Sequence, residues 1–211
     1  SASLHCVQFS ADGSKIVTAS RDRTVRLWSG DDGRPLGTIT AHAMPVTCAQ
    51  FSPDSSMVAS YGAEGVVHVH RSSDASKVRS FVHDTKGAVN AALFSRDGKT
   101  VYSAGDDGLL KVWDLNGDIP IRIVDVRKDL PAADPLSSPS LPSIASLALS
   151  ADGTRLAAAV QQVAIVWDVA TWKPLATLGG HREALRTLAF SPNDANRVVT
   201  AGFEERARLF H

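Results

Sequence analysis

One pattern recurs five times along the 211 residues and constrains the fold more than any other feature. Each copy starts with an apolar segment that closes on a large hydrophobic side chain. A turn, a second apolar segment and a third segment follow, and the third often ends in tryptophan. Apart from one longer interval, the copies succeed each other at ~40–45 residues, a period that indicates a repeat protein. The residues that close the first segments are Phe9, Phe51, Phe94, Leu149 and Phe190.

The best-preserved copy is VNAALFSRDGKTVYSAGDDGLLKVWD, residues 89–114. Its apolar segments predict three short strands over residues 89–95, 100–104 and 109–114. Asp97-Gly98 predicts a hairpin between the first two, because this dipeptide favours two-residue turns. An outer fourth strand is expected over residues 119–124, with counterparts over 35–40 and 174–178.

The first strand of each copy carries apolar residues on both of its faces. In the first copy, Val7 and Phe9 share one face, and Leu4 and Cys6 share the other. A sheet that is apolar on both faces must be covered on both. Radial stacking of sheets provides this cover and leaves only short, protected edges.

On these residues the chain resembles the WD40-repeat β-propeller family. Trp113-Asp114 and Trp167-Asp168 match the dipeptide that names the family, and Gly180-His181 matches the Gly-His element that precedes a repeat. The resemblance implies an all-β propeller with five recognisable blades. The expected parts are residues 1–40, 41–82 and 83–126 (blades 1 to 3), 127–143 (an inserted loop), 144–180 (blade 4) and 181–211 (blade 5, lacking its outer strand).

Both ends of the sequence suggest that it belongs to a larger ring. His42 precedes Phe51 by the same number of residues as His181 precedes Phe190. The same spacing would place the histidine of the first copy just before residue 1. No outer strand follows Phe210. Because propellers of this family usually have about seven blades, we expect further blades outside this sequence.

The resemblance also implies a buried polar tetrad in each blade: a His before the first strand, a hydroxyl on the second, an acid in the second turn and a Trp on the third. Only blade 3 carries all four, and blade 4 has lost its His, hydroxyl and acid. The expected structural tetrad residues are His83, Ser103, Asp107 and Trp113 in blade 3, Thr18, Asp22 and Trp28 in blade 1, and His42 and His181 in blades 2 and 5.

A set of His, Ser and Asp is also the composition of a catalytic triad. The set recurs in degraded form around the repeats, however, which a scaffold tolerates and a single active site would not. The residues also match as donors and acceptors of a buried network. We therefore expect a structural role, no catalytic residues and no enzyme activity.

Composition and motifs exclude several classes of function. The chain has 22 Lys and Arg and 22 Asp and Glu, so its net charge gives no support to a nucleic-acid or anionic-membrane partner. It has no apolar run of ~18 residues that would insert into a membrane, and no signal peptide. No phosphate loop or nucleophile elbow is present, so no cofactor or small-molecule substrate is expected. The expected location is intracellular, in the cytoplasm.

Histidine and cysteine pairs are the remaining chemical candidates. His68 and His70 share a strand face, but no Cys or acid stands at ligand spacing, so no metal site is expected. Cys6 and Cys48 occupy equivalent positions in neighbouring blades. Equivalent faces point the same way, so we expect their Cα atoms to be farther apart than the ~7 Å that a disulfide allows.

Binding is expected on the rim formed by the loops before the first strands and between the second and third strands, the usual binding face of the family. Arg and exposed aromatic residues are common interface hot spots. The candidate partner-binding residues are Arg21, Met44, Tyr61, Lys86, Asp106 and Phe203. The prolines of the 127–143 insert exclude a regular strand or helix there. The insert is interpreted as a linker, or alternatively as a docking arm or a modification site at Ser138-Pro139.

These observations predict a non-catalytic scaffold for protein–protein interactions, as a propeller subunit or domain of a multi-subunit complex. The partners would be other proteins. The alternative is a sensor or regulatory propeller attached to a signalling enzyme domain outside this chain. The function rests on the family resemblance, because a fold does not determine a function.

Overall fold

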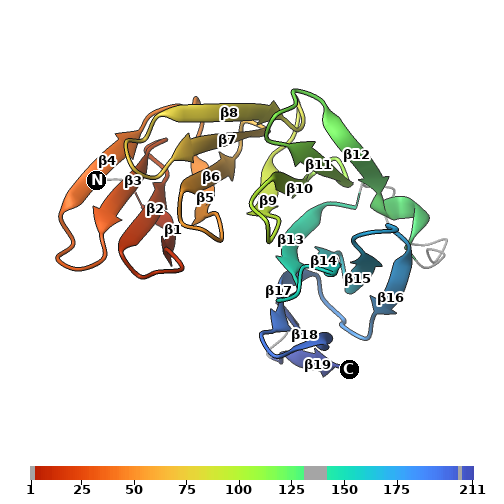
Figure 1. Ribbon diagram of the computed structural model, residues 1–211. Helices are drawn as coiled ribbons and strands as arrows, with labels where there is room; N and C mark the ends of the chain where they lie inside the picture. The colour runs from red at the N-terminus through yellow and green to blue at the C-terminus, as the bar shows by residue number, and fades with distance from the viewer. Residues whose placement is uncertain (1–2, 131–141, 204–205) are drawn as a thin grey trace. The chain divides into compact units, whose positions relative to one another are not determined.

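The computed structural model describes residues 3–130, 142–203 and 206–211 and is entirely β apart from one short 3-10 helix (Figure 1). Its strands form five antiparallel sheets, four with four strands and one with three. The all-β prediction is thereby confirmed. The described part of the chain contains no helix with the length and apolar character that a membrane span needs.

The chain divides into two compact units, which are described separately. The first comprises Ser1–Ser103 and Lys111–Arg122. It contains blade 1, with strand order β1-β2-β3-β4, and blade 2, with order β5-β6-β7-β8. The strands are β1 (Leu4–Phe9), β2 (Lys15–Ser20), β3 (Val25–Ser29), β4 (Pro35–Ile39), β5 (Val46–Phe51), β6 (Met57–Gly62), β7 (Val66–Arg71) and β8 (Lys77–Val82).

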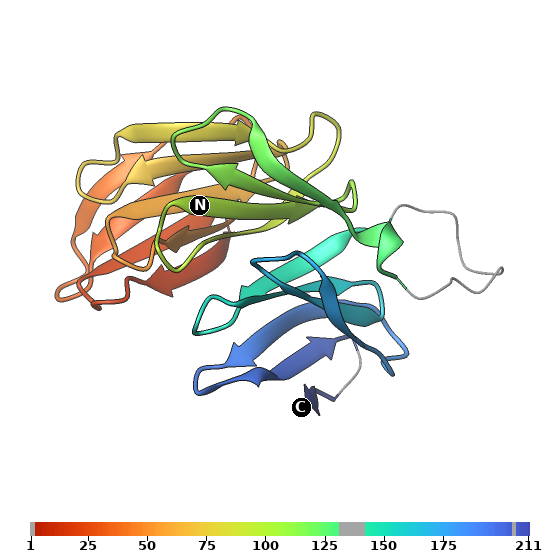
Figure 2. The same cartoon turned by 45° about the vertical axis from the view of Figure 1, so that its right-hand side comes forward.

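Blade 3 consists of β9 (Val89–Phe94), β10 (Thr100–Gly105), β11 (Leu109–Asp114) and β12 (Pro120–Asp125). The second unit comprises Ala104–Leu110 and Ile123–His211 and contains blades 4 and 5 (Figure 2). Their elements are the 3-10 helix η1 (Val126–Lys128), β13 (Ile144–Leu149), β14 (Arg155–Val160), β15 (Val163–Asp168), β16 (Pro174–Leu178), β17 (Leu185–Ser191), β18 (Asp194–Gly202) and β19 (Arg208–Phe210).

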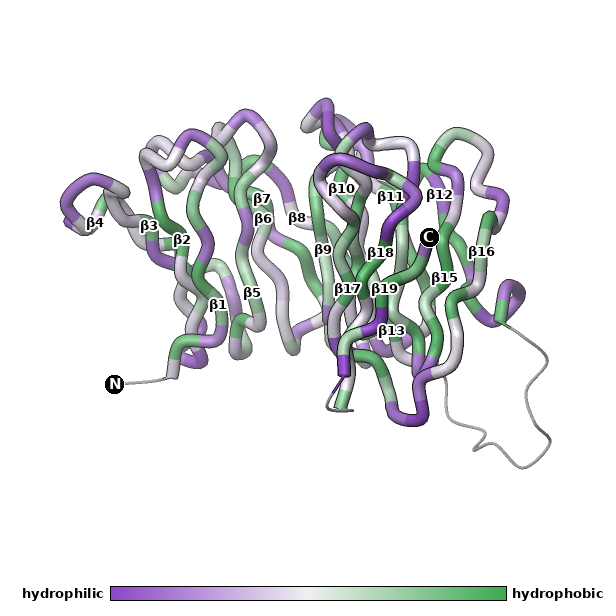
Figure 3. The backbone as a smooth tube through the Cα atoms, turned by 90° about the horizontal axis from the view of Figure 1, so that it is seen from below, coloured by the Kyte–Doolittle hydropathy of each residue, from purple (hydrophilic) through white to green (hydrophobic). Residues whose placement is uncertain are grey.

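The hydrophobic cores lie between neighbouring blades, as a two-faced apolar strand requires. One core joins Val17 and Leu27 of blade 1 to Val46 of blade 2. In the second unit, Ala157 and Val166 of blade 4 pack in one cluster with Leu185 of blade 5. Hydrophobic residues accordingly concentrate in the strands and hydrophilic ones in the turns (Figure 3).

β1 is the exception among the first strands, because its apolar side chains are exposed. Leu4 is 64% exposed, whereas its counterparts Val46 and Val89 are fully buried, and Val7 and Phe9 are 67% and 60% exposed. A preceding blade covers the counterparts. Within this chain, no described blade covers β1.

The first hairpin of blades 1 to 4 is built around a serine–aspartate clasp. Ser10 Oγ donates to Asp12 Oδ1 at 2.6 Å, and the Lys15 amide donates to Ser10 Oγ at 2.9 Å. The loop is therefore wider than the expected two residues: β1 ends at Phe9, and β2 begins at Lys15. The same serine-to-aspartate bond recurs at 2.5–2.6 Å in Ser52–Asp54, Ser95–Asp97 and Ser150–Asp152.

Candidate functional site

In the first unit, the loops expected to form the binding rim are held together by backbone bonds. The Ala63 amide, in the turn after β6, donates to the Pro45 carbonyl in the loop before β5. The Gly65 carbonyl accepts from the amides of His83 and Asp84, at 2.9 and 3.1 Å. Gly65 has φ of +72°, and a Cβ there would lie 2.0 Å from the Asp84 carbonyl oxygen. Only glycine fits this close approach.

Three expected rim residues of the first unit are exposed, and one is not. Arg21 and Lys86 are exposed, and Met44 is 48% exposed. Tyr61 was expected beside them, but this prediction is wrong: it is only 7% exposed and packs in the core between blades 2 and 3. Burial raises the pKa of its phenol. Tyr61 lies on β6 opposite Cys48 of β5, and its ring contributes to the same cluster as Val89 and Phe94 of blade 3.

In the second unit, an aromatic–cation pair occupies the expected rim position. Phe203 is 63% exposed, and the Arg186 guanidinium lies 4.1 Å from the centroid of its ring. A cation at this distance is attracted to the face of the ring. Asp106 is also exposed, and one of its carboxylate oxygens accepts from Ser143 Oγ at 3.0 Å.

The tetrad residues of blade 3 form a buried network around one hydroxyl. Trp113 Nε1 donates to Ser103 Oγ at 2.8 Å, and His83 Nδ1 lies 2.7 Å from the same oxygen. Ser103 is fully buried, so a substrate has no access to it as a nucleophile. Asp107 accepts the Leu109 amide in the turn before β11. The arrangement suits a structural network rather than a catalytic one.

Blades 1 and 5 retain parts of this network. In blade 1, Trp28 Nε1 donates to Thr18 Oγ1 at 2.9 Å. The Asp22 carboxylate accepts a hydrogen bond from Thr24 Oγ1 and forms an ion pair with Arg26 at 3.3 Å. Hydrogen bonds from Thr24 are the largest cause that lowers the pKa of this carboxyl. In blade 5, His181 Nε2 lies 2.7 Å from Thr200 Oγ1.

The tryptophan of blade 4 has a partner that the sequence did not indicate. Trp167 is fully buried, and its Nε1 donates at 2.8 Å to a carboxylate oxygen of Asp129. Asp129 directly follows η1, whose Val126 carbonyl accepts the Asp129 amide. This short helix occupies the start of the insert, where no regular structure was expected. The expected modification site at Ser138-Pro139 lies outside the described residues.

Blade 2 departs furthest from the tetrad and gathers three histidines. His42 Nε2 lies 2.7 Å from Ser60 Oγ, the bond that matches His83 and Ser103 in blade 3. His42 Nδ1 lies 2.5 Å from Glu64 Oε1, and His68 Nε2 lies 3.1 Å from the same oxygen. His70 stands where blades 1, 3 and 4 carry tryptophan. No acid was expected at ligand spacing from His68, yet Glu64 lies four residues before it, in the turn between β6 and β7.

Burial lowers the pKa of these histidines, because the charged imidazolium loses its hydration. The pKa falls to about 4 for His42 and for His70, with burial as the largest cause in both. The pKa of His68 is also lowered, again mainly by burial. All three rings are therefore neutral near pH 7, with lone pairs that can accept hydrogen bonds or coordinate a metal.

The prediction that Cys6 and Cys48 are too far apart is wrong. Their Cα atoms lie 5.0 Å apart, and the two sulfurs form a disulfide between blades 1 and 2. Both strands have a register shift here, between Leu4 and Cys6 in one and between Val46 and Cys48 in the other. A bulge re-aims a side chain relative to regular pleating, which the expectation of identically oriented faces ignored.

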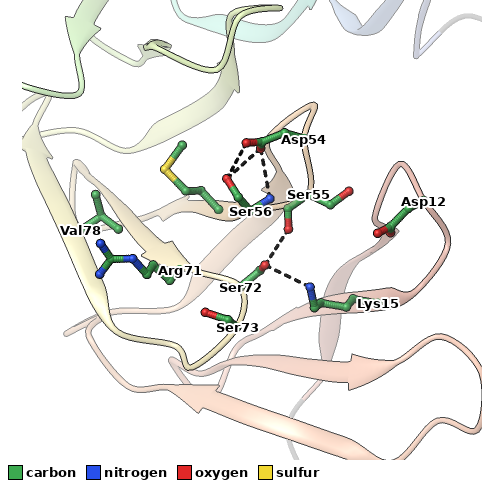
Figure 4. A pocket seen from close by; sticks show the side chains of 10 residues that line it. Asp12, Lys15, Asp54, Ser55, Ser56, Arg71, Ser72, Ser73 and Val78 are labelled. Atoms are coloured by element: carbon green, nitrogen blue, oxygen red, sulfur yellow. Dashed lines mark hydrogen bonds between the residues drawn. The ribbon is translucent and has the colours of Figure 1, made fainter.

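A polar cleft of about 510 Å³ lies between blades 1 and 2 (Figure 4). The Lys15 ammonium donates to Ser72 Oγ at 3.3 Å, and Ser72 Oγ donates to the Ser55 carbonyl at 2.6 Å. The Asp12 and Asp54 carboxylates lie in the same cleft as Lys15 and Arg71. Its charges therefore balance locally, and no predicted site residue lines it.

Comparisons with known proteins give the family. The model of the family "WD domain, G-beta repeat" matches residues 1–29, 33–71, 75–114 and 172–211, well over half of the chain. It passes over most of blade 4, the blade without a His, hydroxyl or acid at the tetrad positions.

Three curated relatives illustrate the similarity. The chain is 26% identical to the guanine nucleotide-binding protein subunit beta of Saccharomyces cerevisiae, over 94% of the chain and 54% of that protein. It is 30% identical to the WD repeat-containing protein VIP3 of Arabidopsis thaliana, over 89% of the chain and 58% of that protein. It is 39% identical to the WD repeat and SOCS box-containing protein 1 of Xenopus tropicalis, over 72% of the chain and 46% of that protein.

The chain thus spans about half the length of these relatives, and none of the three names denotes an enzyme activity. The family model matches the repeats that the strands form, and the blade-3 network has the tetrad composition. The chain belongs to the WD40 repeat family.

Proposed function

We propose that this chain is a non-catalytic scaffold that binds other proteins, as a WD40 propeller subunit or domain of a larger assembly. The observation that carries the proposal is the exposed Phe203 with Arg186 stacked on its ring at a rim loop of blade 5. Aromatic and arginine side chains are the residue types that most often dominate binding energy at interfaces. Met44, Arg21 and Lys86 add an exposed apolar and basic surface on the rim of the first unit.

The relatives support membership of an assembly. One is named a subunit, and another similar protein is named a "DDB1- and CUL4-associated factor 11 homolog". The alternative, a sensor propeller attached to a signalling enzyme, depends on a domain outside this sequence. No observation in the chain favours it.

The polar networks belong to this proposal as structural locks. Their hydroxyls are buried, with Ser103 fully buried, so in this proposal they hold loops to strands. An intracellular location also belongs to the proposal. The Cys6–Cys48 disulfide is evidence against a reducing compartment, because disulfides there are rare. Thiol trapping in intact cells decides this point.

The test is affinity purification of the tagged full-length protein, followed by mass spectrometry. We expect one set of proteins to co-purify in fixed ratio with the wild type. Phe203→Ala should lose members of that set, and so should the pair Arg21→Ala and Met44→Ala if the rim of the first unit contributes. The matched controls are Leu175→Ala and Leu36→Ala, on outer strands, where the leucines are 51% and 41% exposed. Equal recovery with rim and control variants would refute the rim as the binding surface.

A further inference from the structure

The histidine cluster of blade 2 has the composition and the orientation of a metal site. One ligand atom from each of His42, Glu64 and His68 lies within 4.8 Å of the other two. Two imidazoles and one glutamate are a set that binds Zn²⁺ in proteins, with a water as the fourth ligand. At Zn–N and Zn–O bonds of ~2.0–2.2 Å, tetrahedral ligand atoms lie roughly 3.3 Å apart. The two distances to Glu64 Oε1, 2.5 and 3.1 Å, are slightly shorter than that value, and the two histidine nitrogens lie at most 4.8 Å apart, so small side-chain shifts would admit the ion.

Each of the three candidate ligands is already oriented by a second contact. The far nitrogen of His42 is held by Ser60 Oγ, and the far nitrogen of His68 by Ser80 Oγ, both at 2.7 Å. The second oxygen of Glu64 accepts the Ala43 amide at 2.8 Å. Metal-binding histidines almost always have the other ring nitrogen hydrogen-bonded in this way. The near nitrogens of both rings are left facing one carboxylate oxygen.

Proton positions allow the cluster to exist with or without an ion. Without metal, His42 Nδ1 and His68 Nε2 carry the hydrogens and donate to Glu64, while the serine hydroxyls donate to the far nitrogens. With metal, the hydrogens reside on the far nitrogens, which donate to the serine oxygens. A hydroxyl can donate or accept, so the same two serines support both states.

Burial and an unpartnered nitrogen point the same way. The His42 side chain is fully buried, while Glu64 and His68 keep 12% and 11% of their side-chain surface exposed, which gives water a path to the fourth position. His70 is 4% exposed, and its Nδ1 has no hydrogen-bond partner among the described residues. Its ring centroid lies 6.2 Å from that of His68. A buried polar atom without a protein partner often marks the place of a water or ion.

We propose that blade 2 binds one Zn²⁺ ion through His42 Nδ1, His68 Nε2 and the Glu64 carboxylate, with a water completing the tetrahedron. The ion would join the loop before β5, the β6–β7 turn and β7, and so would take the place of the tryptophan lock that this blade lacks.

Blade 1 provides the matched control. Arg26 faces Thr18 as His68 faces Ser60, and Arg26 forms an ion pair with Asp22 four residues earlier, as His68 contacts Glu64. His68→Arg should therefore fold with an Arg–Glu pair in place of the His–Glu contact, while it removes one metal ligand. His211→Gln removes an exposed histidine and controls for surface binding.

The experiment is calorimetric titration of the chelator-treated full-length protein with ZnCl₂, with Co²⁺ absorption as a second readout. We expect the wild type and His211→Gln to bind one more equivalent than His68→Arg and Glu64→Gln. The intense visible absorption of tetrahedral Co²⁺ should appear only in the first two. Zn²⁺ should raise Tm only in those proteins, and Ser80→Ala should weaken binding by about 10–100-fold.

Folding of each variant is checked by circular dichroism before titration. Equal stoichiometry in the wild type and in folded His68→Arg would overturn the proposal, as would a wild type without tetrahedral Co²⁺ absorption. If Glu64→Gln fails to fold, His68→Arg and the wild-type spectrum still decide. Loss of the partner set in the Phe203→Ala experiment leaves this result untouched, because the two sites lie in different units.

Discussion

Trp113 offers the sharpest test of the structural role of the polar network. Trp113→Phe keeps an aromatic ring against Phe81, whose ring is stacked on it with centroids 5.0 Å apart, but removes the Nε1 donor to Ser103. A net hydrogen bond contributes about 0.5–1.5 kcal/mol, and an acceptor left buried without its donor costs about 1–3 kcal/mol. We expect Trp113→Phe to lower the free energy of unfolding by about 1–2 kcal/mol. Trp113→Ala also empties a large buried volume and should cost about 3–5 kcal/mol.

The assay is urea unfolding of the wild type, Trp113→Phe, Ser103→Ala and the double variant. If the indole–hydroxyl bond is a real coupling, the double variant should lose less than the sum of the single losses, with an interaction energy of at least ~0.5 kcal/mol. Trp172→Phe, at a half-buried turn residue with no tetrad role, is the control and should change stability by no more than ~0.5 kcal/mol. Additivity within ~0.3 kcal/mol would refute the network as the source of stability.

Three further predictions concern separate parts of the chain. Asp129→Ala leaves the buried Trp167 indole unpartnered and should lower the free energy of unfolding by about 1–3 kcal/mol in urea titrations. In a protein that already carries Trp167→Phe, which has no indole donor, Asp129→Ala should have little further effect on that free energy. Reduction of the Cys6–Cys48 disulfide, which spans 42 residues, should cost roughly 4 kcal/mol on the chain-entropy account, measured as the Tm difference with and without reductant; free thiols in the unreduced protein would contradict it. Hydrogen bonds from Ser10 and then Ser14 lower the Asp12 pKa from 3.8 to about 2, so its stabilisation is complete above pH 3.8 and disappears as pH falls towards 2; Asp12→Asn should flatten the Tm–pH curve in that interval.

The sequence was sufficient for the parts of the fold that depend on period and polarity. The first strand of blade 3 was expected to start at Val89, and β9 does. The outer strand expected to begin at Pro174 is β16. Both strands could be predicted because their apolar residues lie on both faces of the strand, which is visible in the sequence. The expectation of about seven blades concerns sequence outside this chain and stays a prediction.

The parts that could not be predicted depend on local irregularity or on contacts between distant segments. Cys6 and Cys48 meet because the register shifts beside each, and regular pleating gives no sign of that. Tyr61 packs inward on a strand end that the rim pattern assigned to the surface. Asp129 reaches Trp167 across 38 residues, from an insert that was interpreted as a linker, a docking arm or a modification site. The contact between His68 and Glu64 could not be predicted either, because Glu64 lies in the turn before β7 and its spacing from His68 was not among the ligand spacings considered.

The blades together show which requirement the fold enforces. Trp113 and Trp167 are buried and Trp28 is half-buried, and each indole N–H has an acceptor: a serine, an aspartate from an insert and a threonine, respectively. The acceptor differs from blade to blade, but the indole donor always has one, because an unpaired buried donor is costly. Where blade 2 gives up tryptophan for His70, the constraint disappears. The His70 ring instead lies 6.2 Å from the ring of His68, which contacts Glu64. We therefore expect new chemistry in this propeller at blade 2, which has no tryptophan at the tetrad position, rather than at blade 3, which keeps all four tetrad residues.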